Sequence, residues 1–424
     1  MKLMDVNLIG RFSDMRLTTN CLRYSAMLIA IIFDGAFANN NQPHDIIDQY
    51  YRRIESKLKH DAPDNLNELD QEISAIVQEL FDVERLAAQV LQNQWSKSNR
   101  SQQARFVAAL QKSLQDKIAA EANVFRNQAS LMFTLESADV KDKFATLNYS
   151  IASDPIQKHL TIFMLKYPGE NWKISNVKSG NESLLQFYFS LCKKQIDRYS
   201  LPQLIAVLQN DDFVVLEDFE GEGAGLLPSG WNWRKQDDAK NKPYKIKEEN
   251  GNQFLAAEDN GESVILGKDI KWDLKKYPYI SFKWRARRLP VGGDERYGHT
   301  VDSAAGIYII YKEKLGLIPE SIKYVWSTTL PVGSAMRRSG TGRPWMVVAE
   351  CGDAHVDEWR TYVFNISEAY EKTFGGKPPD TPVGIAILSD ANSTSSKAYA
   401  DYDDIRALKN ADAGSGIRDF LKAE

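Results

Sequence analysis

Apolar residues recur at three- and four-residue intervals over most of residues 43–210, which predicts amphipathic helices. One helix follows Asp82, whose side chain can cap it, and a longer helix follows Ser101. Their apolar stripes are Val83, Leu86, Ala87, Val90 and Leu91 in the first, and Phe106, Val107, Leu110, Leu114 and Ile118 in the second. The helical period returns after Gly180, and Pro202 opens a last short helix.

Between these helices the pattern changes to that of strands. Several segments rich in β-branched and aromatic residues are separated by turn residues, with a clear turn at Pro168–Asn171. The three or four expected strands fall within Ala129–Leu135, Phe144–Ile151, His159–Tyr167 and Trp172–Val177. This order of elements predicts an α+β domain over residues 43–210, with helices on one face of a curved antiparallel sheet.

From Phe213 onward the alternation is that of strands throughout. In Tyr279–Arg287 every second residue is apolar, as in a strand with one buried face. Further strands are expected at Gly306–Tyr311, Ser321–Ser327, Trp345–Glu350, Arg360–Phe364, Val383–Ser389 and Lys397–Ile405. Short strands with Gly, Pro, Asn and Asp between them predict an all-β sandwich or jelly roll over residues 213–408, followed by a flexible tail at 409–424.

Composition limits the class of protein. The 424 residues are 43% hydrophobic and 26% charged, as in ordinary globular proteins, which excludes wholesale disorder, collagen and coiled coil. A net charge of −4 provides no overall field for nucleic acid, and we expect no nucleic-acid partner. Cys192 and Cys351 fall in different predicted domains, so we expect two small buried residues without a disulfide or a metal site.

The first residues are typical of an export signal. Two arginines precede an apolar run from Ala26 to Phe33, and a small-x-small pattern ending at Ala38 fits a cleavage site. The run is shorter than the ~20 residues of a membrane-spanning helix. We therefore expect a soluble periplasmic protein with a signal peptide at 1–38, or at 15–38 if translation starts at Met15. An uncleaved anchor or a buried helix is the alternative.

Residues 43–210 resemble the MlaC family of periplasmic phospholipid carriers, also called the toluene-tolerance family. The resemblance rests on Phe81–Ala87 with Val90, Leu91 and Trp95, Gln102–Val107, Trp172–Val177 and Gly180–Leu185. Gln92 and Asn176 stand where the family usually has Gly and Asp. The resemblance implies a phospholipid or other acyl lipid as ligand. It also implies, as partners, an Mla-type inner-membrane ABC transporter complex and an outer-membrane component.

A carrier of this kind needs an apolar cavity, because burial of each CH₂ group contributes about 0.8 kcal/mol. Helical stripes that face one side of a sheet can enclose such a space. The expected lipid-binding walls are Leu86, Val90, Phe106, Leu110, Phe133, Leu147, Phe163, Leu165 and Phe189. The same residues also fit a filled core, and periodicity alone does not separate the two.

The second region, about Phe219 to Leu408, resembles domain-of-unknown-function family 3047, whose members are exported bacterial proteins with a predicted β-sandwich. The resemblance rests on Phe219–Gly221, Gly230–Trp231, Lys283–Arg285, Tyr324–Ser327, Phe374–Gly375 and Ser389–Thr394. It implies no activity. Motifs of metalloproteases, α/β-hydrolases and P-loop enzymes do not occur, so we expect no catalytic residues. Acidic loops leave a glycan-active enzyme as an alternative, since two facing carboxylates are enough for that chemistry.

Aromatic and charged side chains of the second region predict a ligand site there. Tyr324 and Trp326 share one side of their strand, and Arg285 lies opposite the apolar face of its own, as in modules that bind a sugar ring. The expected sandwich ligand-binding residues are Arg285, Asp302, Tyr324, Trp326, Asp390, Asn392 and Thr394. Core aromatics with a surface arginine are the alternative. Phosphate or an anionic head group is a second ligand class, because arginines cluster at 285–288 and 337–343.

The spacing Asp390-x-Asn392-x-Thr394, followed by Asp401, is similar to that of a calcium loop, although Ser395 replaces the usual glycine. A structural calcium ion near Asp390 is therefore a hypothesis, with a simple Asx turn as its alternative. No other cofactor is expected. Together the two regions predict a non-enzymatic periplasmic lipid-transport protein, with a sandwich module for docking or for a second envelope ligand. A carbohydrate-binding or cell-envelope adaptor protein is the alternative.

Overall fold

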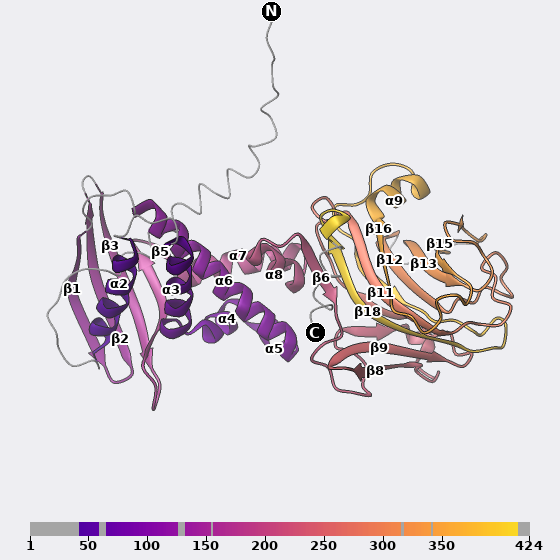
Figure 1. Cartoon of the computed structure of the whole chain (residues 1–424), viewed down its shortest axis with the longest axis horizontal. Helices are drawn as coiled ribbons and strands as arrows, with labels where there is room; N and C mark the ends of the chain where they lie inside the picture. Colours follow the sequence, from indigo (N-terminus) through magenta and orange to yellow (C-terminus); the bar gives the residue numbers. More distant parts are fainter. Residues whose placement is uncertain are drawn as a thin grey trace, which may run out of the picture. The chain divides into compact units, whose positions relative to one another are not determined.

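The computed structural model describes residues 42–58, 65–125, 132–153, 156–314, 318–340 and 342–413 (Figure 1). The expected signal peptide at 1–38, the start at Met15 and most of the expected tail lie outside these residues. The described chain forms two compact units. The first unit comprises the residues up to Lys97 together with Ala104–Lys194, and the second comprises Ser98–Gln103 together with the residues from Gln195 onward.

The first unit combines helices with one antiparallel sheet. Its helices are α2 (Pro43–Leu58), α3 (Asn65–Leu80), α4 (Val83–Leu91), α5 (Asn93–Lys97), α6 (Arg100–Phe125) and α7 (Leu184–Arg198). Its strands are β1 (Met132–Lys141), β2 (Phe144–Ser153), β3 (Ile156–Lys166), β4 (Trp172–Ser179) and β5 (Glu182–Ser183), in this order across the sheet. The predicted α+β class is confirmed, and Figure 1 shows helices running along the sheet.

Helix α4 begins after Asp82, as predicted, and ends at Leu91, the last residue of the predicted stripe. The Asp82 carboxylate accepts the N–H of Arg85 at 3.2 Å, and the five residues of the predicted apolar stripe are the buried ones. Gln92 then takes φ 49° and ψ −123°, a left-handed backbone that favours glycine, and the chain continues into the short α5. The position where the MlaC family usually has glycine is thus the position where this backbone requires one.

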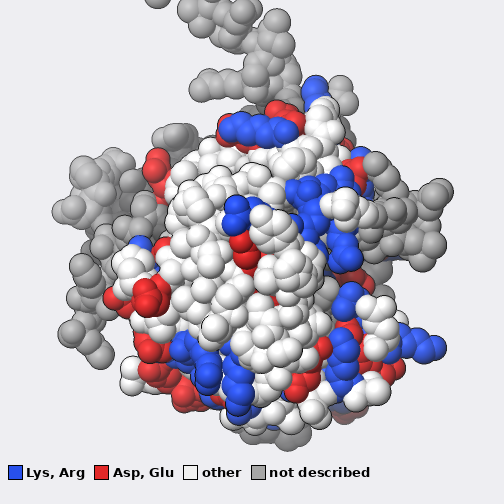
Figure 2. Space-filling view, turned by 90° about the vertical axis from the view of Figure 1, so that its right-hand side faces the viewer, with Lys and Arg blue, Asp and Glu red and all other residues white. Residues whose placement is uncertain are grey.

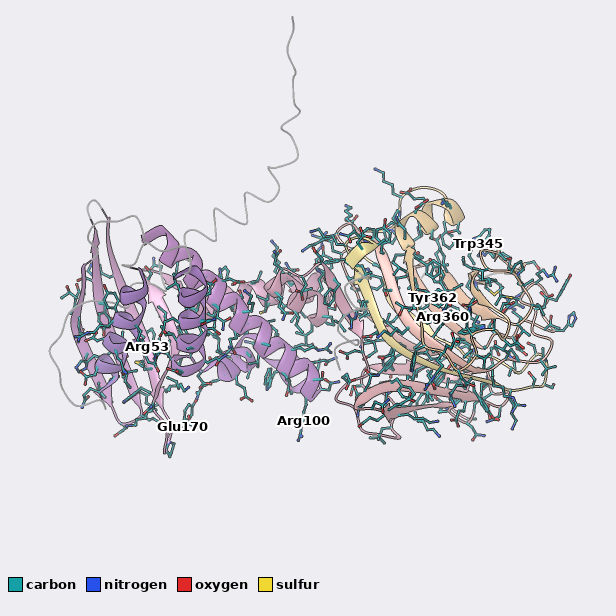
Figure 3. The ribbon with its side chains drawn as sticks, in the orientation of Figure 1. Arg53, Arg100, Glu170, Trp345, Arg360 and Tyr362 are labelled. Atoms are coloured by element: carbon teal, nitrogen blue, oxygen red, sulfur yellow. The ribbon has the colours of Figure 1, made fainter. Side chains whose placement is uncertain are left out.

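An ion-pair cluster joins α2 to α3. Arg53 of α2, labelled in Figure 3, pairs with Glu72 and Glu79 of α3, and Tyr50 donates a hydrogen bond to Glu79 at 2.9 Å. Burial and the neighbouring Glu79 raise the pKa of Tyr50 to about 12. The tyrosine therefore remains a neutral donor at any physiological pH.

The second unit is built almost entirely of strands. Its strands are β6 (Phe213–Glu217), β7 (Trp231–Trp233), β8 (Tyr244–Glu249), β9 (Asn252–Asp259), β10 (Leu266–Asp269), β11 (Tyr279–Arg288), β12 (Ala305–Lys314), β13 (Ile318–Ser327), β14 (Ala335–Met336), β15 (Trp345–Cys351), β16 (Arg360–Asn365), β17 (Gly384–Ile387) and β18 (Ala398–Leu408). Its helices are α8 (Leu201–Gln209), the 3-10 helix η1 (Lys235–Asp237) and α9 (Ile366–Phe374). The predicted all-β class is confirmed.

The strands of the second unit pair in two sheets. One has seven strands in the order β14-β15-β13-β12-β17-β10-β7, and the other has the order β16-β11-β18-β9-β8, with β6 paired to β18. The pairing of β13 with β15 is parallel, whereas the other described pairings in these sheets are antiparallel. This arrangement is a sandwich with a mixed edge on the seven-stranded sheet.

Aromatic side chains fill the space between the two sheets. Phe282 and Trp284 of β11 lie 4.9 Å apart by ring centroids, and Trp284 lies 6.3 Å from Trp326 of β13. Tyr324 stacks on Phe364 at 4.1 Å. Rings of this size contribute the largest share of apolar burial, so they account for much of the stability of this unit.

Helix α8 belongs to the second unit by its contacts. Ala206 packs in the apolar core of the sandwich, and the Gln203 side chain accepts the N–H of Asp273 at 3.1 Å. Tyr199, at the end of α7, donates a hydrogen bond to the Asp273 carboxylate at 3.0 Å. The contact boundary therefore falls inside α7, ahead of residue 210 where the helical pattern ends.

Candidate functional site

The first unit buries one face of its sheet. Leu147 of β2 lies opposite Ile162 of β3, and Ile162 lies opposite Val177 of β4, so the three residues share one face. All three are fully buried, as are Leu110 and Phe106 of α6, and Leu86 and Val90 of α4 are also buried. This helix-covered face and the helices above it form an apolar layer, and five of the predicted wall residues occupy buried positions in it (Leu86, Val90, Phe106, Leu110 and Leu147).

Two of the predicted wall residues lie on the other face of the sheet, which corrects the prediction. Phe163 lies opposite Thr146, and Leu165 lies opposite Phe144, whose side chain is 54% exposed. Residues one position apart on a strand point to opposite faces. Phe163 and Leu165 therefore cannot form one wall with Leu147, and the inward residues of β3 are Leu160, Ile162 and Met164.

Two further wall predictions have different outcomes. Phe189 lies on α7, where it is partly buried, next to the buried Tyr188. Phe133 lies on β1 opposite Ile151, but its side chain is outside the described residues. Cys192, also on α7, is free and fully buried, and burial raises the pKa of its thiol to about 12.

The turn between α3 and α4 attaches the helices to the edge of the sheet. Asp82 donates its backbone N–H to the carbonyl of Ile174 at 3.1 Å, and Tyr167 donates its hydroxyl to the Asp82 carboxylate at 2.9 Å. Arg85 contacts the same hydroxyl, and Lys173 donates to the carbonyl of Glu79 at 2.7 Å. A small polar pocket of about 260 Å³ lies at this turn. Asp82 and Arg85, both within Phe81–Ala87, thus help to dock the helix on the sheet.

In the second unit, the structure corrects the predicted sugar-stacking site. Tyr324 and Trp326 do share one side of β13, but this side faces the core, and neither ring is more than 1% exposed. Trp326 donates its indole N–H to the carbonyl of Gly352 at 2.9 Å. A ring that is enclosed on all sides cannot stack on an external sugar, so these two residues are structural.

Arg285 belongs to an ion-pair network on the other sheet. Its guanidinium pairs with Asp401 at 2.8 Å and with Glu249 at 3.1 Å, and it lies 4.8 Å from the ring centroid of Trp359. Arg287 pairs with the same Asp401 at 2.9 Å. Figure 3 labels Tyr362 and Arg360 of β16; Tyr362 donates to Glu350 of β15 at 2.5 Å, and Arg360 lies 3.9 Å from the same carboxylate.

The predicted calcium ligands have protein partners. Asp401 is held by two arginines, and Thr394 donates its hydroxyl to the buried Asp302 at 2.7 Å. Asp302 also accepts the N–H groups of Ser393 and Thr394, at 3.1 and 2.6 Å. Among the described residues, no group of three or more His, Cys, Asp or Glu side chains is placed to hold a metal ion. Asp302 and Thr394 thus anchor a loop.

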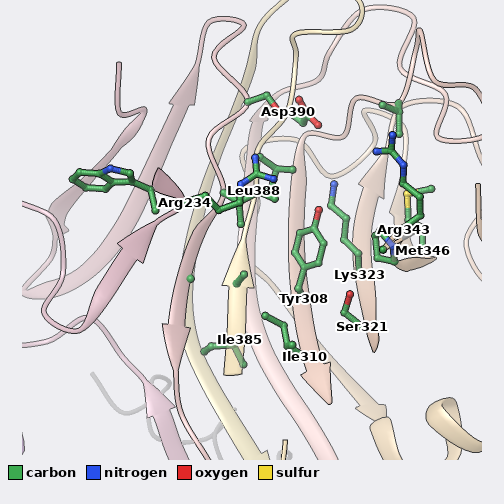
Figure 4. A pocket seen from close by; sticks show the side chains of 18 of the residues that line it. Arg234, Tyr308, Ile310, Ser321, Lys323, Arg343, Met346, Ile385, Leu388 and Asp390 are labelled. Carbon is green, nitrogen blue, oxygen red and sulfur yellow. The ribbon is translucent and has the colours of Figure 1, made fainter. Parts of the chain in front are cut away.

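Asp390 and Asn392 line a groove on the outer face of the seven-stranded sheet (Figure 4). The groove has a volume of about 650 Å³, and its floor comes from β12, β13, β15 and β17. Tyr308 and Lys323 also line it, and Figure 4 shows their side chains rising side by side from neighbouring strands. Sequence reasoning did not select Lys323, although it lies between the buried Ile322 and Tyr324 and so must point to the opposite face.

Fold and sites together define a two-part protein, with an α+β unit that has an apolar layer and a sandwich that has a polar groove. Residues 45–210 match the family model described as MlaC protein, and residues 229–406 match the model of DUF3047, a protein family of unknown function. Both predicted resemblances, one for each region, are thus confirmed.

One solved structure similar to this chain is a phospholipid-binding protein from Ralstonia solanacearum in complex with a phospholipid. It is 16% identical, and the similarity covers 39% of this chain and 94% of that chain, with a TM-score of 0.33. No curated protein matches the chain. Within the described residues, no helix is long and apolar enough to span a membrane.

Proposed function

We propose that residues 45–210 bind a phospholipid or a related acyl lipid, and that the chain is an exported, non-enzymatic lipid carrier of the periplasm. The observation that carries this proposal is the match of this region to the MlaC family model. The resemblance to MlaC carriers implies the ligand class, the compartment and a carrier role. It also implies delivery between an inner-membrane ABC transporter complex and an outer-membrane component.

The apolar layer of the first unit is where the acyl chains would bind. A chain of about fourteen CH₂ groups gains roughly 10 kcal/mol when it leaves water, at about 0.8 kcal/mol per group. That gain can offset the free energy needed to separate the helices from the sheet, provided that the acyl chain replaces the contacts between them. Leu110 and Leu147 represent the two sides of this layer, one on α6 and one on β2.

Lipid extraction followed by mass spectrometry tests the proposal on the purified exported chain. We expect phospholipid to copurify with the parent protein. Leu147→Trp should reduce the bound lipid at least fivefold with little change in melting temperature, because the added ring occupies space that the acyl chains use. Overpacking a core that never opens costs about 1–3 kcal/mol instead.

Thr146→Trp is the matched control, since Thr146 is the preceding residue of the same strand and lies on the other face. It should retain the lipid of the parent. A parent protein without lipid contradicts the proposal. So does Leu147→Trp protein that carries as much lipid as the parent, or that loses lipid only because it unfolds.

For the second unit we propose a separate binding role, as a docking module or as the site of a second ligand of the cell envelope. The groove on the seven-stranded sheet supports this role, because it is a concave surface with both charged and aromatic groups. Nothing in the described part of this unit assigns a chemical step to it.

A further inference from the structure

We propose that the groove of the second unit binds an acidic carbohydrate, meaning a sugar that carries a carboxylate or phosphate group. Lys323 would meet the anionic group, and Asp390 would accept a sugar hydroxyl. This site differs from the sugar-stacking site expected at Tyr324 and Trp326. It is independent of lipid binding by the first unit.

The buried lysine is the central observation. The side chain of Lys323 is only 2% exposed, yet it lines the groove, and its ammonium nitrogen lies 5.5 Å from the ring centroid of Tyr308. None of the ion pairs among the described residues includes Lys323. It interacts electrostatically with the buried Asp390, but the two are not among these pairs. A buried charge without a close ion pair is costly, so such a group usually meets a counter-charge from elsewhere.

The position of Lys323 depends on a glycine in the neighbouring strand. A Cβ atom at Gly306 would lie 2.3 Å from Lys323 Cε and 3.2 Å from its ammonium nitrogen. Any other residue at 306 would therefore displace the lysine. The strand leaves a space that the lysine side chain occupies on its way to the groove.

Charge in the groove favours an anionic ligand. The lining contains five basic residues and two carboxylates: Arg234, Lys268, Lys323, Arg338 and Arg343 against Asp269 and Asp390. Lys268 pairs with Glu217 at 2.6 Å and Arg234 with Asp237 at 3.1 Å. The described ion pairs include neither Arg338 nor Arg343. Lys323, Arg338 and Arg343 therefore stand against Asp269 and Asp390, which leaves a net positive charge in a concave site, where low-dielectric walls concentrate the field.

Two buried polar atoms indicate that the ligand also carries hydroxyl groups. Oδ1 of Asp390 and Nε of Arg338 are both buried without a hydrogen-bond partner. Buried polar atoms are normally satisfied, and one left unpaired costs about 1–3 kcal/mol. The arginine needs an acceptor and the carboxylate needs a donor. A simple anion supplies mainly acceptors, and inorganic phosphate has only one or two P–OH donors, whereas an acidic sugar supplies several groups of both kinds.

The loops around the groove are held in place by buried carboxylates. Asp259 accepts the N–H groups of Gly261, Glu262 and Ser263 at 2.9–3.1 Å, and that of Ala391 at 3.0 Å. Burial raises the pKa of Asp259 to about 6. Asp302 holds Ser393 and Thr394 in the same way. Because Ser263 and Ser393 line the groove, its rim is fixed before a ligand arrives.

The geometry favours a small sugar over a membrane surface. Figure 2 shows basic side chains in groups on the face of the second unit that it presents, but Lys323 is enclosed and cannot reach a flat layer of head groups. A groove of about 650 Å³ lies within the range of roughly 300–1,000 Å³ that is usual for small-molecule sites.

Isothermal titration of the full-length protein tests the proposal with digalacturonic acid, glucose 6-phosphate, glucose and inorganic phosphate as probes. We expect one or both acidic sugars to bind, with glucose and inorganic phosphate at least tenfold weaker. Lys323→Met should weaken binding of the acidic sugar at least tenfold, because it retains the volume of the side chain and removes its charge. Lys372→Met, an exposed lysine of α9 outside the groove, is the matched control and should bind as the parent does.

Arg343→Ala and Asp390→Asn keep the test decisive if Lys323→Met fails to fold. Arg343 is exposed, so its loss should weaken acidic-sugar binding at an unchanged melting temperature. Asp390→Asn should weaken binding of the acidic sugars more than binding of inorganic phosphate, because the sugars offer more hydroxyl donors to this carboxylate. Three results would overturn the proposal. Inorganic phosphate could bind as tightly as glucose 6-phosphate, glucose could bind as tightly as the acidic sugars, or neither acidic sugar could bind. Binding only to phosphatidylglycerol vesicles would overturn it as well.

Discussion

The candidate site of the first unit lies on the inward face of its sheet, whereas the candidate site of the second unit lies on the outward face of its own. In the first unit, the inward face of β2–β4 forms an apolar layer beneath the helices, and the outward face is partly exposed. In the second unit, the inward face of β13 is filled with aromatic rings, and the outward face carries the groove with Lys323. The same strand alternation therefore yields an apolar site in one region and a charged site in the other, depending on which face is covered.

The largest effect should come from the aromatic core of the second unit. Trp326→Ala should lower the free energy of unfolding by about 3–5 kcal/mol, because it leaves a cavity in a closely packed core. Tyr308→Ala, on the groove side of the same sheet, should cost about 1 kcal/mol or less and affect ligand binding instead. Urea denaturation measures both values. A fully stable Trp326→Ala protein would contradict the assignment of this ring to the core.

Neighbouring residues of β3 test the same contrast in the first unit. Ile162→Ala should cost about 2–4 kcal/mol, since Ile162 is fully buried on the inward face. Phe163→Ala should cost roughly 1 kcal/mol despite the larger ring, because Phe163 lies on the outward face and is only partly buried. Thermal unfolding of the two variants shows which of them loses more stability. The reverse order of stabilities would mean that the register of β2 and β3 is shifted by one residue.

A pH effect should appear in the second unit and depend on Asp403. Burial, together with the neighbouring Asp404, raises the pKa of Asp403 from 3.8 to about 7. A carboxyl whose pKa is raised on folding contributes stability below about pH 4, and this contribution is lost as the pH rises through about 7. The melting temperature of Asp403→Asn relative to the parent should therefore increase between pH 5 and pH 8. Asp353→Asn, at an exposed position, serves as control, and a pH-independent difference for Asp403→Asn would contradict the prediction.

The smallest effect should come from the end of α4. Gln92→Gly should stabilise the first unit by about 0.5–1 kcal/mol, because glycine adopts the left-handed backbone at φ 49° without strain. Gln92→Ala should bring no such gain, since alanine keeps the Cβ atom. The melting temperatures of the two variants give the comparison, and equal values would show that the backbone at this position is not strained.

Much of the fold followed from the sequence. The helical stripe of Val83–Leu91, the alternation of Tyr279–Arg287 and the turn at Pro168–Asn171 each predict a local element, because burial on one face imposes a fixed period. Both family resemblances are confirmed by the matching family models.

The candidate sites were harder to predict from the sequence than the fold, for a physical reason. Alternation shows that Tyr324 and Trp326 share a face, but it does not show which face the second sheet covers. Lys323 could be found from the sequence only once those aromatics are known to be buried. The wall prediction for Phe163 and Leu165 was wrong for a related reason: both faces of β3 carry apolar residues, so the pattern does not show which face the helices cover. The roles of Asp259 and Asp302 depend on loops far apart in the sequence, which no local pattern reveals.

Native mass spectrometry of the full-length protein with both ligands tests the central claim most directly. The parent should carry a copurified phospholipid and, after addition of digalacturonic acid or glucose 6-phosphate, one acidic sugar. Leu147→Trp should lose the phospholipid and keep the sugar, and Lys323→Met should lose the sugar and keep the phospholipid. Loss of both ligands in either folded variant, or of neither ligand in both, would contradict the account of two separate sites with opposite chemistry.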